Sequence, residues 1–201
     1  ICQPGGLPNR LFVQNSDGTA TDRSNQSGVD YLDNTSSALL IDLDNDGDQD
    51  LYVTNYGPSR LFVSNGDGTF DDRTAVAGLA DHDSTFRATG CAWGDFDQDG
   101  LLDLVVVRHL HERELRMFQA DGFVRAVRAL TLYRNDGDGG FTTVTQYLGD
   151  TSGPGRADDI GNVWGAGFQP GWVDIDNDGD PDLYVVNDYG PQVTPNVLWR
   201  N

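Results

Sequence analysis

The sequence contains no lysine and is poor in cysteine, glutamate and long apolar runs. All 13 basic residues are arginine, whereas 32 residues are acidic, so the formal net charge is −19. This charge argues against nucleic acids and anionic membranes as partners, because both are themselves negative. No apolar run approaches the roughly 18 residues of a membrane-spanning helix. Two cysteines are too few for a disulfide framework.

The two cysteines lie in different surroundings. Cys91 lies in an apolar segment, where we expect a small buried residue, while Cys2 could pair with it or with a cysteine outside this chain. The chain begins at Ile1 rather than Met and has no signal-peptide pattern. We therefore expect a mature or excerpted segment.

Motifs typical of catalysis are also missing. The sequence has no G-x-S-x-G, phosphate-binding loop, H-E-x-x-H or C-x-x-C motif. His109 and His111 would share one face of an extended segment, but no third ligand for a transition metal is in view, and we expect two surface histidines. The sequence thus predicts a protein that is not an enzyme.

One acidic phrase occurs three times, at 42–53, 95–106 and 174–185. Each copy has Asp at positions 1, 3, 5 and 9, Gly at position 6 and Leu at position 10. Alternating oxygen ligands, folded back by a glycine, suit Ca²⁺, which takes roughly six to eight of them. Position 12 is Val53, Val106 or Val185 instead of the Glu of an EF-hand, so we predict calcium loops in β-hairpins.

Plain Asp-Gly turns are the alternative interpretation of these loops. Three copies that share the ninth Asp and the following Leu are harder to explain in that way. Without a cation the carboxylates of each loop would repel one another, so we expect metal binding to be part of folding. Three Ca²⁺ ions would add six positive charges to the −19 and leave a net charge of −13.

A second phrase alternates with the acidic loops, at 9–19, 59–70, 130–141 and 196–201. It is a short apolar strand ending in Asn, followed in the first three copies by a Gly/Asp turn. Together the phrases predict strands at about 10–14, 19–23, 37–41, 51–54, 60–64, 69–74, 88–94, 103–108, 131–134, 141–147, 166–173, 182–187 and 197–200. We expect loop position 2 (Leu43, Phe96 and Ile175) to point toward the core.

Repeated four-stranded units predict an all-β protein, a β-propeller of four-stranded antiparallel blades with calcium loops between first and second strands. Parallel roll repeats have a shorter period, and a sandwich would not need the same loop three times. Residues 1–201 then form one segment: a half-blade 1–30, a blade 31–80, a blade 81–150 with an insertion at 109–130, and a partial blade 151–201. Propellers close with about four to eight blades, so these roughly three predict an arc of a larger ring. Unseen sequence or other chains would complete it.

The loop phrase D-x-D-x-D-G-x-x-D-L-[YV]-V, with N-x-L-[FWY]-x-N and N-x-D-G-T-F between copies, resembles the FG-GAP/VCBS repeat. Such repeats build integrin α-subunit propellers and, in closer wording, cartilage acidic protein and its ASPIC/UnbV relatives. The resemblance covers the chain except 109–130. It implies backbone carbonyl ligands at Asp48, Leu101 and Asp180. It implies carboxylate ligands at Asp42, Asp44, Asp46, Asp50, Asp95, Asp97, Asp99, Asp103, Asp174, Asp176, Asp178 and Asp182.

The resemblance also implies extracellular binding, adhesion or matrix roles, with calcium as a structural ion. Millimolar calcium outside cells suits open acidic loops, and sequons at Asn25 and Asn34, both expected in one loop, suit a secreted or cell-surface glycoprotein. We therefore predict a calcium-binding module for protein or carbohydrate. The alternatives are a structural subunit of an extracellular filament or matrix, which would self-associate, and a propeller domain of a polysaccharide-degrading enzyme.

The insertion at 109–130 concentrates arginine on an otherwise acidic molecule. Together with Arg108, its arginines are Arg113, Arg116, Arg125 and Arg128. They belong either to a solvated helix that packs Leu115, Met117 and Phe118 on the blade, or to a docking element for an acidic glycan or the acidic face of a like protein.

Overall fold

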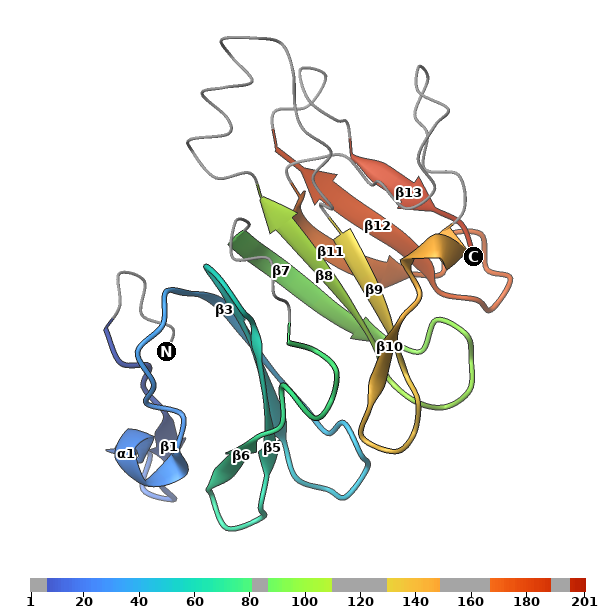
Figure 1. Ribbon diagram of the computed structural model, residues 1–201. Coiled ribbons are helices and arrows are strands. Elements are labelled where there is room, and N and C mark those ends of the chain that lie inside the picture. Colours follow the sequence, from blue (N-terminus) through green and yellow to red (C-terminus); the bar gives the residue numbers. More distant parts are fainter. Residues whose placement is uncertain (1–6, 81–86, 110–129, 149–166, 189–195) are drawn as a thin grey trace, which may run out of the picture. The chain divides into compact units, whose positions relative to one another are not determined.

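The computed structural model describes residues 7–80, 87–109, 130–148, 167–188 and 196–201. The chain divides into two compact units, Ile1–Ser84 and Thr85–Asn201. Both are built from antiparallel sheets, with little helix (Figure 1). Among the described residues, no helix has the length and apolar character needed to cross a membrane.

The first unit contains a two-stranded and a four-stranded sheet. Its elements are β1 (Phe12–Gln14), β2 (Ala20–Asp22), α1 (Ser24–Ser27), β3 (Thr35–Ile41), β4 (Asp50–Asn55), β5 (Arg60–Ser64) and β6 (Phe70–Asp72). β1 pairs with β2, and the larger sheet has the order β3-β4-β5-β6. Every strand thus pairs with its sequence neighbour, as short hairpin connections require.

An apolar cluster on one face of the four-stranded sheet stabilises the first unit. Its buried members are Val29, Val53 and Phe62, and Leu11, Tyr31, Leu51 and Phe70 pack against them. Full burial of such a side chain stabilises the fold by roughly 1.5–3 kcal/mol. At the cluster's edge the Arg60 guanidinium lies 4.7 Å from the Tyr31 ring centroid and pairs with the Asp33 and Asp72 carboxylates.

The second unit contains a four-stranded sheet in the order β10-β9-β8-β7 and a three-stranded sheet in the order β11-β12-β13. The elements are β7 (Arg87–Gly94), β8 (Asp103–His109), β9 (Leu130–Asn135), β10 (Phe141–Thr143), the 3-10 helix η1 (Thr145–Leu148), β11 (Gly167–Val173), β12 (Asp182–Asn187) and β13 (Val197–Trp199). The two sheets pack on each other, with β11 against β7 and β8.

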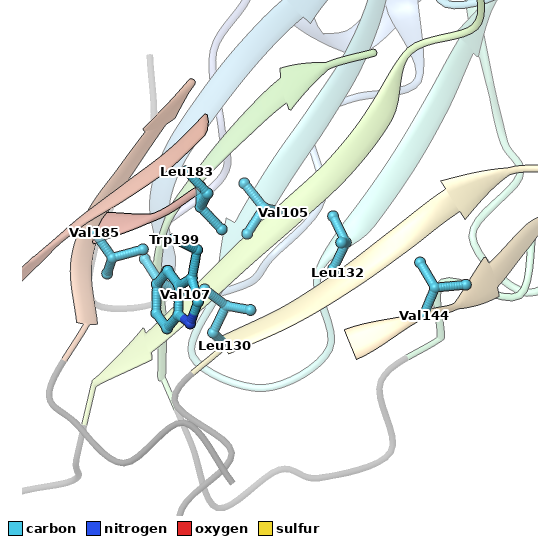
Figure 2. Close-up of a cluster of buried hydrophobic side chains, with 8 residues drawn as sticks. All are labelled: Val105, Val107, Leu130, Leu132, Val144, Leu183, Val185 and Trp199. Carbon is cyan, nitrogen blue, oxygen red and sulfur yellow. The ribbon is translucent and has the colours of Figure 1, made fainter. Parts of the chain in front are cut away.

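The core of the second unit lies between its two sheets (Figure 2). The four-stranded sheet and the segment after β10 contribute Val105, Val107, Leu130, Leu132 and Val144, and the three-stranded sheet contributes Leu183, Val185 and Trp199. Close approach of β7 to β11 depends on glycine, because a Cβ on Gly94 would lie 2.5 Å from Trp172 Cδ1. The Thr89 hydroxyl also donates to the Gly167 carbonyl at 2.6 Å, which joins the sheets at their edge.

The predicted strand order and antiparallel pairing are confirmed for the described residues, and the four-stranded sheets are consistent with propeller blades. The fourth strands are shorter than predicted: β6 ends at Asp72, not at 74, and β10 ends at Thr143, not at 147. In each case a hydroxyl just after the strand accepts a backbone N–H of the preceding strand. Thr74 accepts from Leu61 at 2.9 Å and Thr145 from Leu132 at 3.1 Å. A side-chain acceptor thus replaces the next ladder bond, and the strand ends.

Candidate metal centres in three acidic loops

Three acidic loops, loop 1 (42–50), loop 2 (95–103) and loop 3 (174–182), have the same backbone form. The fourth residue of each has a positive φ, 58° at Asn45, 58° at Gln98 and 59° at Asn177. The glycine at position 6 also has a positive φ, of 93°, 89° and 99° in loops 1 to 3, which suits a residue without Cβ. Three loops with different neighbours therefore fold in one way.

The first aspartate of each loop is held by that glycine. The N–H of Gly47 donates to Asp42 Oδ2 at 3.2 Å, and the equivalent bonds to Asp95 and Asp174 measure 2.9 and 3.1 Å. The N–H at position 7 donates to the carboxylate at position 5, at 2.9, 2.9 and 3.1 Å, from Asp48, Leu101 and Asp180. These bonds bend the chain so that alternate carboxylates converge.

Three carboxylates converge in each loop, with ligand atoms within 4.8 Å of one another. In loops 1 and 2 they come from positions 1, 3 and 5, and in loop 3 from positions 1, 3 and 9: Asp42, Asp44, Asp46; Asp95, Asp97, Asp99; Asp174, Asp176, Asp182. Carboxylate oxygens are hard ligands of the kind that Ca²⁺ and Mg²⁺ take. Each loop could therefore hold a metal ion.

One oxygen in loop 1 supports this interpretation independently of sequence. Asp42 Oδ1 is buried, and no hydrogen-bond donor among the described residues reaches it. Burying a carboxylate oxygen without a partner is costly, whereas a bound cation would satisfy it. The donor set of loop 1 thus fits a divalent cation, and loops 2 and 3 share its donor chemistry and backbone form.

The ninth aspartate of each loop has a second role that the sequence did not reveal. Asp50, Asp103 and Asp182 are at most 1% exposed. In each, Oδ2 accepts the N–H of loop position 2 at 2.9 Å. The other oxygen, Oδ1, accepts the N–H of a residue at the end of the neighbouring strand or two residues after it: Ser64 at 2.8 Å, Asn135 at 2.8 Å and Asn201 at 3.0 Å. The ninth aspartate therefore joins the loop to the sheet.

Burial and crowding of negative charge raise the pKa of several loop carboxyls. Burial, with the nearby Asp97 and Asp99 charges, raises the pKa of Asp103 to about 6, against the N–H bonds from Asn135 and Phe96. Burial likewise raises the pKa of Asp50, and partial loss of solvent with the charges of its loop neighbours raises the pKa of the largely exposed Asp97. A bound divalent cation would oppose these effects by favouring the charged carboxylates.

Residues at loop position 2 do not all point inward. Leu43 is 7% exposed, and Phe96 packs against the core of the second unit, as predicted. Ile175 is 51% exposed, so the prediction is wrong there. Phe96 packs on the core between the two sheets of the second unit, and Ile175 is not among the residues packed there.

Loops 2 and 3 are linked by two side-chain amides whose role the sequence did not indicate. Gln98 of loop 2 donates to the Gly179 carbonyl of loop 3 at 3.1 Å and also contacts the Asp180 carboxylate. Asn201 donates from its side chain to the Phe96 carbonyl at 2.5 Å. Their positions depend on packing between two sheets, which no local motif encodes.

Several other predicted residues fall outside these loops. Asn25 is exposed on α1, and Asn34 directly precedes β3, so the two sequons do not share one loop as predicted. Cys91 is buried with a free thiol, and burial raises its pKa to about 12. Arg108 is also buried, and it donates to the Thr131 hydroxyl at 2.7 Å, which removes it from any surface cluster.

Most of the other residues singled out in the sequence lie outside the part of the chain that the structure describes. Arg113, Arg116, Arg125, Arg128, His111 and Cys2 lie outside the described residues. His109, expected at the surface, has a side chain only 15% exposed, with Nε2 lying 3.5 Å from the Asp188 carboxylate.

Comparison with protein families matches residues 42–106 to a model described as an FG-GAP-like repeat. The match spans loops 1 and 2, and the all-β architecture with four-stranded antiparallel sheets is consistent with a β-propeller-like fold of such repeats. A comparison with curated proteins finds no match. The resemblance to FG-GAP repeats is thus confirmed, while the more specific relatives stay a prediction. Residues 42–106 of this chain are thus similar to an FG-GAP-like repeat.

Proposed function

We propose that this protein is a calcium-binding, β-propeller-type module of the extracellular space or cell surface, in which calcium is structural and the sheets present a surface for protein or carbohydrate. The FG-GAP-like repeat at 42–106 supports a propeller-type binding module. Three acidic clusters that could hold a metal ion support the calcium sites. The proposal includes no catalytic activity.

The observation that carries the proposal is the buried Oδ1 of Asp42, which has no hydrogen-bond partner in the described part of the chain and lies within a triad of converging carboxylates. A cation there would be coordinated by that oxygen and by carboxylate oxygens of Asp44 and Asp46, and it would offset the mutual repulsion of the three negative charges. The same loop form recurs twice, so three ions are expected. The backbone carbonyls of Asp48, Leu101 and Asp180 stay candidate ligands from the resemblance.

Calorimetric titration of the metal-free protein with CaCl₂ tests this proposal. We expect three bound ions, and thermal unfolding that moves to higher temperature with calcium and returns on chelation. Asp42→Asn, Asp95→Asn and Asp174→Asn should each remove or weaken one site. Asp71→Asn is a matched control, because Asp71 is an exposed aspartate on β6 outside the loops. Absence of binding at millimolar calcium would contradict the proposal.

The extracellular setting and the partner class have their own tests. Asn25 is exposed, so expression through a secretory pathway should add a glycan there, detectable as a mass lost with glycosidase treatment. An array of proteoglycan fragments and matrix proteins, probed in calcium and in chelator, would identify the ligand class. Deletion of 109–130 tests the arginine-rich docking element. Unchanged glycan binding and unchanged self-association would rule it out.

A structural subunit of a larger assembly is a second candidate function, favoured by one apolar surface. On the outer face of the three-stranded sheet, Tyr184, Val186 and Leu198 are 38%, 38% and 36% exposed. Their register equivalents in the neighbouring sheet, Val105, Val107 and Leu132, are 0% exposed because a sheet covers them. Sedimentation of the parent and of Tyr184→Asp would decide this candidate. A monomer at all accessible concentrations would argue against it.

A further inference from the structure

Loop 3 differs from the other loops because one of its candidate ligands is already paired with a cation of the protein. Arg200, directly after β13, forms an ion pair with the carboxylate of Asp176 at loop position 3. We propose that Arg200 competes with Ca²⁺ for Asp176, so that loop 3 is the weakest of the three calcium sites and fills last. This inference rests on the proposed calcium binding.

The register of the three sheets identifies the equivalent position beside each loop. Leu183 pairs with Trp199, Leu104 with Tyr133 and Leu51 with Phe62. The residue after the aromatic partner is therefore equivalent in all three sheets: Arg200 beside loop 3, Arg134 beside loop 2 and Val63 beside loop 1.

These three positions differ in charge or in the carboxylate with which the charge pairs. Arg134 pairs with Asp136 at 2.9 Å, and Asp136 lies outside loop 2. The Arg134 charge still acts weakly on Asp97, whose pKa is raised by burial and by the Asp99 charge in spite of it. Val63 has no charge. At this register position the residue beside loop 1 is uncharged, the arginine beside loop 2 pairs with Asp136, and the arginine beside loop 3 pairs with a candidate ligand.

Competition follows from charge and geometry. An Asp176 oxygen held by a guanidinium has less electron density to offer a metal ion, and an arginine left beside the site repels a divalent cation. The pair is partly exposed, with side-chain exposures of 65% for Arg200 and 27% for Asp176, so solvent and salt weaken the effect. We therefore expect removal of the charge to strengthen calcium binding at loop 3 by roughly three- to tenfold.

Loop-resolved titration of the whole chain tests this inference. The position 6 amides of Gly47, Gly100 and Gly179 each donate to the first aspartate of one loop, so their NMR shifts report each loop separately. In the parent protein we expect Gly179 to respond at the highest calcium concentration. In Arg200→Met the Gly179 midpoint should fall three- to tenfold, with Gly47 unchanged and a smaller shift at Gly100.

Two further variants separate charge from packing. Arg200→Lys keeps the charge and should leave the Gly179 midpoint near the parent value, while Arg134→Met should change the Gly100 midpoint less than Arg200→Met changes Gly179. The effect of Arg200→Met should also shrink as NaCl is raised, because screening weakens the competition. An unchanged Gly179 midpoint in Arg200→Met, with Gly47 still responding to calcium, would overturn this inference alone. No response at any of the three glycines would overturn the calcium proposal as well.

Discussion

Replacement of Asp103 by alanine should destabilise the protein even when no metal is bound. Asp103 is 0% exposed and accepts two backbone N–H groups, from Phe96 at 2.9 Å and from Asn135 at 2.8 Å. Alanine would leave both donors without their acceptor, at a cost of about 1–3 kcal/mol each. Alanine also relieves the cost of burying a carboxylate beside the Asp97 and Asp99 charges, the cost that raises the pKa of Asp103. We therefore expect a net loss of roughly 1–3 kcal/mol, still a sizeable share of the 5–15 kcal/mol that typically holds a domain folded.

The matched control is Asp97→Ala in the same loop. Asp97 is exposed, so its removal should weaken calcium binding at loop 2 but change metal-free stability by less than about 1 kcal/mol. Urea unfolding of both variants in excess chelator, followed by tryptophan fluorescence, gives the two free energies of unfolding. Equal destabilisation by the two substitutions would refute the view that the ninth aspartate is a structural link between loop and sheet.

Three further predictions concern packing, pH and the buried thiol. Gly94→Ala should lower the free energy of unfolding by about 1–3 kcal/mol, because the new Cβ overlaps the Trp172 indole ring. Gly171→Ala is the control: the new Cβ has open space around it, so the free energy of unfolding should stay within about 0.5 kcal/mol of the parent value. Thermal unfolding measures both. Hydrogen bonds from the hydroxyl and N–H of Ser24, followed by an arginine ion pair, lower the pKa of Asp22 to about 2. The ionised Asp22 carboxylate therefore stabilises the fold fully above about pH 3.8, and this stabilisation is lost as pH falls through about 2. The difference in free energy of unfolding between the parent and Asp22→Asn should close over this window. A difference that stays constant with pH would contradict the assignment. Cys91, whose pKa is raised to about 12, should resist iodoacetamide at pH 8 in the folded protein with its other cysteine replaced, and mass spectrometry should detect rapid labelling only after unfolding.

Much of the fold could be predicted because its determinants are local. The short apolar runs that contain Val53 and Val185, the Asn-containing turns and the Asp-Gly phrases each fix a hairpin from within a few residues. Spacing between the phrases then gives the strand order, which the two four-stranded sheets confirm. The three converging carboxylate groups follow from the same local pattern, because the glycine at position 6 and the asparagine at position 4 of loops 1 and 3 tolerate a positive φ.

What could not be predicted depends on groups that are distant in sequence. Exposure of Ile175 depends on which sheet covers loop position 2, and the pattern of the loop is the same in all three copies. The hydroxyls of Thr74 and Thr145, which end the fourth strands, act on residues 13 positions away. The sequence pattern predicts the ninth aspartate only as a metal ligand, because the motif does not indicate which carboxylates accept hydrogen bonds from distant backbone N–H groups.

The side-chain amide hydrogen bonds between loop 2 and loop 3 provide a route for energetic coupling between the two candidate metal sites. Asn201 donates its backbone N–H to Asp182 and its side-chain amide to the Phe96 carbonyl, so one residue touches the frame of both loops. Gln98 adds a second tie, to Gly179. If an ion in one loop tightens these ties, it raises the affinity of the other loop, and the reciprocal effect must be equal in free energy. Loops 2 and 3 of the second unit would then bind calcium with positive cooperativity.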